Sequence, residues 1–210
     1  MTDKSLKDGT RLMLYVVMLA NLSVFYTIVQ HNAIVTGTWL DLLRNGSSAL
    51  PAGIGLVLTG ILNAQLSADM KSRIVFLRWR NPLPGCEAFS RHAKEDPRID
   101  LGAIQRLCGN LPEDPREQNA LWYRLYKSVE SEPSVAQVHR SFLFARDYAC
   151  MSLMFAVTLG TLAFFQLSSR GLAVFYFAAL AIQFLLASQA ARNHAKRFVT
   201  TVLSIKAATA

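Results

Sequence analysis

The charged residues of this chain are distributed so unevenly that they constrain its fold class. Asp, Glu, Lys and Arg are absent from four segments, each at least twenty-one residues long: 12–40, 45–68, 148–169 and 171–191. A helix needs about 20 apolar residues to cross a bilayer core, whereas an apolar run of about 10–14 is more typical of a buried core helix. Buried helices of a soluble protein are the alternative interpretation, but four segments of this length favour membrane spans. We predict spans over about Leu12–Gln30, Leu50–Ala68, Tyr148–Leu167 and Leu172–Ala190.

The basic residues between these segments predict an orientation, because cytoplasmic loops carry an excess of Lys and Arg. The loop between the first two spans has only Arg44, and the turn between the last two has only Arg170. The basic clusters lie before the first span, around the middle segment and after the last span. Four spans place all these clusters on one side. We therefore expect both termini and the middle segment to be cytoplasmic.

The net charge of +8 has a simple origin under this topology. Its excess sits mainly at the two ends of the chain, beside the predicted spans, where each basic side chain gains about 1 kcal/mol from anionic headgroups. A nucleic-acid site needs a continuous basic face, which the middle segment lacks. We expect the lipid bilayer as a partner and no direct nucleic-acid binding.

The middle segment reads as a set of short helices without strand alternation. Span two should continue as a helix to the corner "NPLPG", where Pro82 and Pro84 stop it. A short helix and a turn at Asp96-Pro97 should follow, then a helix from Asp100 to Gly109. Asp114 and Pro115 predict the start of a longer helix. From about Pro133 one helix of about 35 residues should run into span three.

The predicted fold class is therefore all-α, an integral membrane protein with four transmembrane helices and a helical cytoplasmic domain between spans two and three. Residues 1–68 hold an N-terminal cytoplasmic segment and two spans, 69–147 form the cytoplasmic domain, and 148–210 form a transmembrane hairpin with a basic cytoplasmic tail.

Asp, Glu, Lys and Arg are missing from all four predicted spans, which argues against a proton-coupled transporter or pump. The polar candidates inside the spans are Asn21, Asn63, Gln65 and Gln183. They serve either as interhelical hydrogen-bonding groups or as the lining of a polar path in an oligomer. Small residues also recur every four positions, as in Ser152, Ala156 and Gly160, which allows close helix packing within one chain or in a homo-oligomer.

The middle segment shows no motif for catalysis or cofactor binding. Cys86, His92, Cys108 and His139 lack the paired spacing of a zinc site, so we expect no metal and no cofactor. A nucleophile pair of Cys86 and His92 would make a membrane enzyme, which is the third hypothesis for function. Our first expectation is a protein without enzymatic activity.

The runs "NPLPGCEAFSRHAKEDPRID" and "RNHAKRFVTTVLS" resemble segments of uncharacterised bacterial membrane proteins with four spans. The architecture also resembles membrane components of antiphage defence systems. This resemblance implies an inner-membrane protein, oligomeric, whose cytoplasmic domain senses a signal or binds a cytosolic protein and passes the change to the bilayer. The aromatic and basic candidates for that contact are Trp79, Arg80, Trp122, Tyr123 and Arg124, with membrane anchoring and core packing as their alternative roles. A channel or transporter subunit is the second hypothesis.

Overall fold

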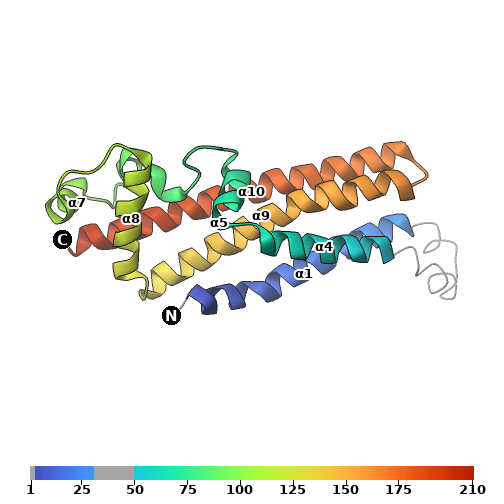
Figure 1. The fold of residues 1–210 in the computed structure, drawn as a ribbon, viewed down its shortest axis with the longest axis horizontal. Coiled ribbons are helices and arrows are strands. Elements are labelled where there is room, and N and C mark those ends of the chain that lie inside the picture. Colours follow the sequence, from blue (N-terminus) through green and yellow to red (C-terminus); the bar gives the residue numbers. More distant parts are fainter. Residues whose placement is uncertain (1–2, 31–49) are drawn as a thin grey trace. The chain divides into compact units, whose positions relative to one another are not determined.

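The computed structural model describes residues 3–30 and 50–210, and all the regular structure in them is helical (Figure 1). Arg44 in the predicted outer loop lies outside the described residues. The helices, in chain order, are α1 (Asp3–Val29), α4 (Leu50–Gln65), α5 (Ala68–Phe76), η2 (Pro84–Glu87), η3 (Ala88–His92), α6 (Ala93–Glu95), α7 (Leu101–Cys108), α8 (Pro115–Val129), α9 (Pro133–Gln166) and α10 (Arg170–Ala208).

Three of these helices are long and apolar enough to cross a membrane. They are α1, over Leu12–Val29, together with α9 and α10. The predicted span over residues 50–68 differs, because α4 has only 16 residues and ends at Gln65. At 1.5 Å per residue it measures roughly 24 Å.

The chain after α4 departs from the predicted continuous helix. Ser67 is extended and accepts a hydrogen bond from the Met70 amide at 3.2 Å, so it caps a new helix, α5. That helix ends at Phe76, before the proline corner, where Leu77 takes a left-handed conformation with φ of 53°. The prediction that span two continues to the corner is therefore wrong. A serine cap at Ser67 and a left-handed turn at Leu77 interrupt the helix.

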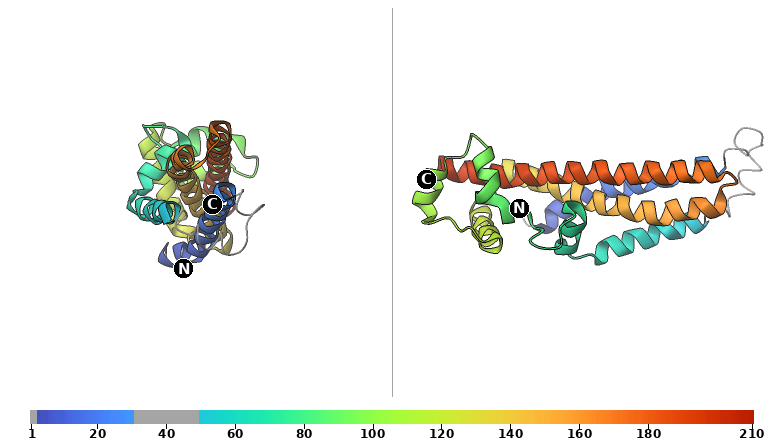
Figure 2. Two further views of the ribbon diagram at one scale, coloured as in Figure 1. Left: turned by 90° about the vertical axis from the view of Figure 1, so that its right-hand side faces the viewer. Right: turned by 90° about the horizontal axis from the view of Figure 1, so that it is seen from above.

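The described helices belong to two compact units. Unit 1 comprises Met1–Thr10, Ser67–Arg146 and Ser188–Ala210, and unit 2 comprises Arg11–Leu66 and Asp147–Ala187. Helices α9 and α10 are each unbroken and contribute residues to both units (Figures 1 and 2). The helix of 34 residues in α9 confirms the long helix predicted from Pro133.

Unit 1 is organised around an aromatic core between α8, α9 and α10. Phe198 of α10 lies edge-on to Trp122 and Tyr126, with ring centroids 5.1 and 5.2 Å away, and stacks on His139 at 4.6 Å. The hydroxyl of Tyr126 is 3.2 Å from His139 Nδ1. The C-terminal segment was predicted to be a basic tail. It is the last part of α10, and its apolar residues complete this core.

The residues predicted to begin and end α7 and to begin α8 in unit 1 do so in the structure. Asp114 accepts from the amides of Arg116 and Glu117, at 2.9 and 3.1 Å, and so begins α8 directly before Pro115. Asp100 caps α7 in the same way, and Gly109 ends it with φ of 78°. These bonds satisfy amides that a helix start leaves unpaired.

Unit 2 has a core of its own, formed by α1, α4, α9 and α10. Phe25 and Phe155 are almost fully buried there, together with small residues such as Ala163 and Ala173. Gly160 on α9 faces the ring of Phe177 on α10 so closely that a Cβ atom would lie 2.6 Å from it. The predicted small-residue contact is thus used within this chain, between two adjacent antiparallel helices (Figures 1 and 2).

Candidate functional site

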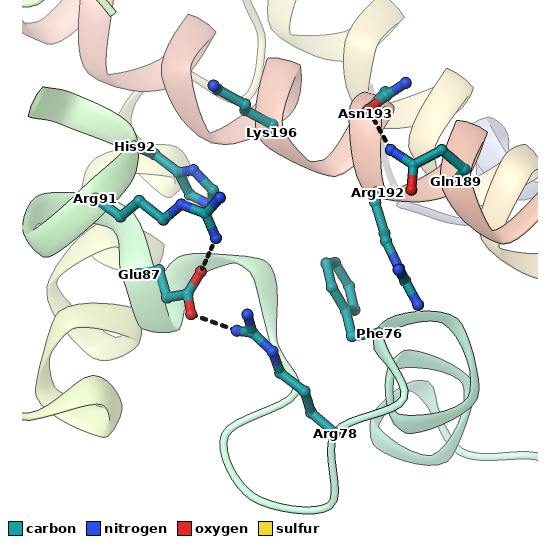
Figure 3. Close-up of a pocket in the computed structure, with 9 residues that line it drawn as sticks. All are labelled: Phe76, Arg78, Glu87, Arg91, His92, Gln189, Arg192, Asn193 and Lys196. Carbon is teal, nitrogen blue, oxygen red and sulfur yellow. Dashed lines mark hydrogen bonds and ion pairs between the residues drawn. The ribbon is translucent and has the colours of Figure 1, made fainter. Parts of the chain in front are cut away.

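A pocket of about 290 Å³ in unit 1 gathers side chains from two stretches that lie far apart in the sequence, 76–92 and 189–196 (Figure 3). Arg78 lies in the loop that follows the left-handed turn at Leu77. Glu87 ends η2, and Arg91 and His92 belong to η3. The remaining wall is one face of α10 and the ring at the end of α5, formed by Gln189, Arg192, Asn193, Lys196 and Phe76.

The α10 face of this pocket follows from helix periodicity. Positions 192, 193 and 196 follow position 189 by three, four and seven residues. This spacing places all four on one side of a helix. Apolar residues of the same helix segment, Ala195, Phe198 and Val199, are buried in the core of unit 1. The segment is therefore amphipathic, with its apolar side in the core and the polar side in the pocket.

Glu87 sits between two arginines of the pocket. Its Oε1 pairs with Nη1 of Arg78, and its Oε2 lies 3.4 Å from Nη1 of Arg91. Arg91 also donates through Nε to Glu95 at 3.0 Å, and Lys196 donates to the same carboxylate at 2.7 Å. The hydrogen bonds from Lys196 and Arg91 lower the pKa of Glu95 to about 2.

Arg192 is fixed by the backbone of α5. Its Nε donates to the carbonyl of Val75 at 2.8 Å. Val75 is fully buried, so this bond ties α10 to the core side of α5. Figure 3 shows the Arg192 side chain running beside the ring of Phe76, while Gln189 donates to Asn193 at 3.2 Å on the same helix.

His92 is the one pocket residue whose ordinary pKa lies near neutrality. Burial lowers its pKa, and this exceeds the opposing effect of nearby Glu87. The ring is therefore neutral at pH 7. Its Nδ1 atom is buried and has no hydrogen-bond partner among the described residues.

The pocket carries more positive than negative charge. Arg78, Arg91, Arg192 and Lys196 face two carboxylates, those of Glu87 and Glu95. Two positive charges are left without a compensating carboxylate in this cluster. Such an arrangement suits the binding of an anion through charge-assisted hydrogen bonds.

The predicted partner-binding residues are not all in one place. Trp79, 77% exposed, and Arg80 line a second pocket of unit 1, of about 660 Å³. Tyr123 and Arg124 are exposed on α8. Trp122 is only 5% exposed and packs in the aromatic core, which is the alternative role that the sequence left open.

Two of the four polar residues predicted inside the spans make side-chain hydrogen bonds within unit 2. Asn21 donates to the carbonyl of Val17 at 3.0 Å, within its own helix. Gln183 donates to the hydroxyl of Tyr148 at 2.9 Å, which joins α10 to α9. Asn63 is buried and Gln65 is exposed. The bond of Gln183 is of the interhelical kind that the sequence predicts.

The cysteines and histidines considered for chemistry do not assemble into a site. Cys86 lines the larger pocket, whereas His92 lines the smaller one. Burial raises the pKa of the Cys86 thiol, which is the opposite of what activates a nucleophile. Over the residues that the structure describes, no three His, Cys, Asp or Glu side chains group as metal ligands, so Cys86, His92, Cys108 and His139 form no such cluster.

Sequence reasoning missed the basic pocket. From the sequence alone, Arg192 and Lys196 belong to the predicted basic tail beside the lipid headgroups. The available signal was the apolar pattern of Phe198, Val199 and Val202 directly after "RNHAK", which indicates a helix with a buried side. The pairing of that helix with η3 could not be inferred from one sequence.

Comparisons of the chain with protein-family models, with curated proteins and with solved structures found no match.

Proposed function

We propose that this chain is a non-enzymatic inner-membrane protein in which unit 2 is embedded in the bilayer and unit 1 is cytoplasmic. In this proposal unit 1 receives a ligand or a cytosolic protein and transmits the change to the membrane through α9 and α10. The observation that carries the proposal is the continuity of α10. One helix supplies an uncharged segment over 171–191, a wall of the basic pocket, and Phe198 at the centre of the aromatic core.

The exposed side chains of unit 2 support its place in lipid. Phe165 is 81% exposed, Phe175 is 71% exposed and Leu186 is 67% exposed. Water-exposed surfaces rarely carry so many large apolar side chains close together, whereas lipid accommodates them. Similar residues project from α1 and α4, including Leu12, Val16, Ile54 and Val57.

A fourth span at α4 is part of the proposal. With α1, α9 and α10 as the only spans, the basic clusters before α1 and after α10 would lie on opposite sides of the membrane. Crossing by α4 returns both clusters to one side, in agreement with the excess of Lys and Arg in cytoplasmic segments. A helix of 16 residues is slightly short for an average bilayer, which local thinning can accommodate.

The alternative, a channel or transporter subunit, has less support. A polar path needs side chains whose polar atoms converge on one lumen. Asn21 is bonded to its own helix and Gln183 to Tyr148, while Gln65 is exposed. Only the buried Asn63, whose Oδ1 has no hydrogen-bond partner among the described residues, keeps this alternative open to test.

Amide hydrogen exchange of the full chain in nanodiscs tests the coupling. Phe198→Leu loosens the core of unit 1 without emptying it. Because α10 is one helix, we expect faster exchange both in residues 192–208 and in the apolar part of the helix before them. A second version with two glycines inserted after Ala190 breaks the helix and should confine the effect to unit 1. If Phe198→Leu changes only unit 1 while α10 is intact, the coupling proposal is wrong.

A further inference from the structure

The basic pocket of unit 1 has the charge and geometry of an anion site. Its cationic groups come from three separate elements: the loop after α5, helix η3 and helix α10. Donors that approach from several directions suit a tetrahedral anion with several acceptor oxygens, whereas a planar carboxylate is satisfied by one guanidinium. The spread of the donors therefore favours a phosphate group over a carboxylate.

Glu87 occupies part of the donor set in the absence of a ligand. It contacts each arginine through a single oxygen, and the Arg91 bond is long, at 3.4 Å. Arg78 and Arg91 have side chains that are 45% and 55% exposed, so both can turn toward a ligand while they keep or release this carboxylate. Glu87 is thus an internal competitor for the anion.

The uncharged residues of the pocket wall indicate which groups the ligand carries besides the anion. A volume of about 290 Å³ is close to the lower end of small-molecule sites, roughly 300–1,000 Å³. It accommodates a phosphate with a small polar substituent. The amide groups of Gln189 and Asn193 can hydrogen-bond to hydroxyls of that substituent, and Phe76 offers an apolar surface beside it.

We infer that the pocket formed by Arg78, Arg91, Arg192 and Lys196 binds the phosphate group of a small phosphate ester. Two sources supply this chemistry: the headgroup of an anionic lipid, or a soluble phosphate compound. Arg192 is the first charged residue after the uncharged segment 171–191 of α10, a position within reach of lipid headgroups if that segment is embedded. The inference depends on the proposed function only for the lipid source, since binding of a soluble phosphate requires no membrane coupling.

The test uses the full chain in phosphatidylcholine nanodiscs, with two probes. Inorganic pyrophosphate is titrated by calorimetry, and phosphatidylglycerol, added to the lipid, is scored by native mass spectrometry as lipid retained on the protein. Arg78→Gln should weaken binding of the effective probe about tenfold, the effect of one charge-assisted hydrogen bond. Arg78 is chosen because, unlike Arg192, no described backbone bond depends on it.

Two further variants separate a site from general charge attraction. Glu87→Gln removes the competing carboxylate and should tighten binding about threefold, although it breaks two ion pairs. Arg106→Gln makes the same charge change as Arg78→Gln at an exposed arginine of α7 that does not line the pocket, and should leave binding unchanged.

Binding of pyrophosphate with this variant pattern supports the inference and identifies a soluble source, and retention of phosphatidylglycerol alone with the same pattern supports it with a lipid source. Failure of both probes to bind overturns it, as does equal weakening by Arg78→Gln and Arg106→Gln. Neither result changes the amide-exchange comparison, so failure of this inference and failure of the coupling proposal are distinguishable.

Discussion

Units 1 and 2 differ in how many large apolar side chains they expose: unit 1 exposes few and unit 2 exposes many. In unit 1 Trp122 and Phe198 are about 5% exposed and form the centre of the core. Unit 2 also buries phenylalanines, Phe25 and Phe155, but Phe165 and Phe175 project outward. Burial of aromatic rings away from water is the main stabilising force in a soluble domain, but lipid provides no such force between helices. The proposed function assigns the two units to different solvents, water for unit 1 and lipid for unit 2.

The largest expected difference lies between two phenylalanines of α10. Phe198→Ala should cost about 3–5 kcal/mol of the free energy of unfolding of unit 1, because it opens a cavity among four aromatic neighbours. Phe175→Ala removes a ring that is 71% exposed and leaves no cavity. Chemical denaturation in detergent, followed by circular dichroism, measures both. Equal losses for the two variants would contradict the assignment of different solvents.

The second-largest expected change in stability concerns the close packing of helices in unit 2. Gly160→Ala places a methyl group 2.6 Å from a ring carbon of Phe177, so the hairpin must shift, at about 1–3 kcal/mol. Gly53→Ala is the matched control, because a Cβ atom there meets nothing within 4 Å. That change should stabilise α4 by up to about 1 kcal/mol. The free energy of unfolding in mixed detergent micelles is measured for both variants. An unchanged stability of Gly160→Ala would show that α9 and α10 do not pack as described.

Loss of a helix cap in unit 1 should reduce the free energy of unfolding by less than these packing changes. Asp114→Ala removes the acceptor for two amides at the start of α8 and should cost about 1 kcal/mol. Asp114→Asn keeps an acceptor oxygen and should restore most of the loss. The free energy of unfolding measured by denaturant is the readout, and equal losses for the two variants would mean that charge, not the cap, is responsible.

Acidification should weaken unit 1 through His92. Burial lowers its folded pKa below the unfolded value of about 6.5, so the unfolded state binds more protons between these two values. The contribution of His92 to stability is complete above about pH 6.5 and declines as the pH falls toward the folded pKa. The charged groups around it are Glu87, Glu95, Arg91 and Lys196. Since the pKa of Glu95 is about 2, that carboxylate stays ionised in this window.

Comparison of stability at pH 7 and pH 5 tests the histidine effect. His92→Gln should remove part of the decline that the wild-type chain shows. A variant with the same decline as wild type would assign the pH dependence to other groups.

The smallest expected effect is that of the polar bond inside unit 2. Gln183→Leu removes the hydrogen bond to Tyr148 and should change stability by only about 0.6 kcal/mol. Tyr148→Phe removes the same bond from the other side, so the double variant should lose less stability than the sum of the two single variants. Additive losses would show that the bond between Gln183 and Tyr148 contributes nothing to stability.

The sequence predicts those parts of the fold that depend on neighbouring residues. Asp100, Gly109 and Asp114 define helix ends through bonds that span two or three residues, and the uncharged segments identify the apolar helices by length alone. The break at Ser67 was missed because a lone serine inside an apolar-to-polar transition is an ambiguous signal. Tertiary structure decides whether it caps a helix or lies within one.

The basic pocket depends on long-range pairing. Lys196 meets Glu95 across 101 positions of sequence, and Arg192 meets Val75 across 117. One sequence provides the charges but not their partners, so Arg192 and Lys196 fitted a lipid-facing tail equally well. The sequence shows which residue types are present, but only the fold brings them together.

Collision accessibility of spin labels tests the central claim, that unit 2 lies in lipid and unit 1 in water. Labels at Phe175→Cys and Tyr123→Cys, with Cys86, Cys108 and Cys150 replaced, are compared in liposomes. We expect the label at position 175 to collide frequently with oxygen and rarely with a water-soluble nickel chelate, and the label at position 123 to do the reverse. A label at position 175 that is as accessible to the chelate as the one at position 123 would contradict it.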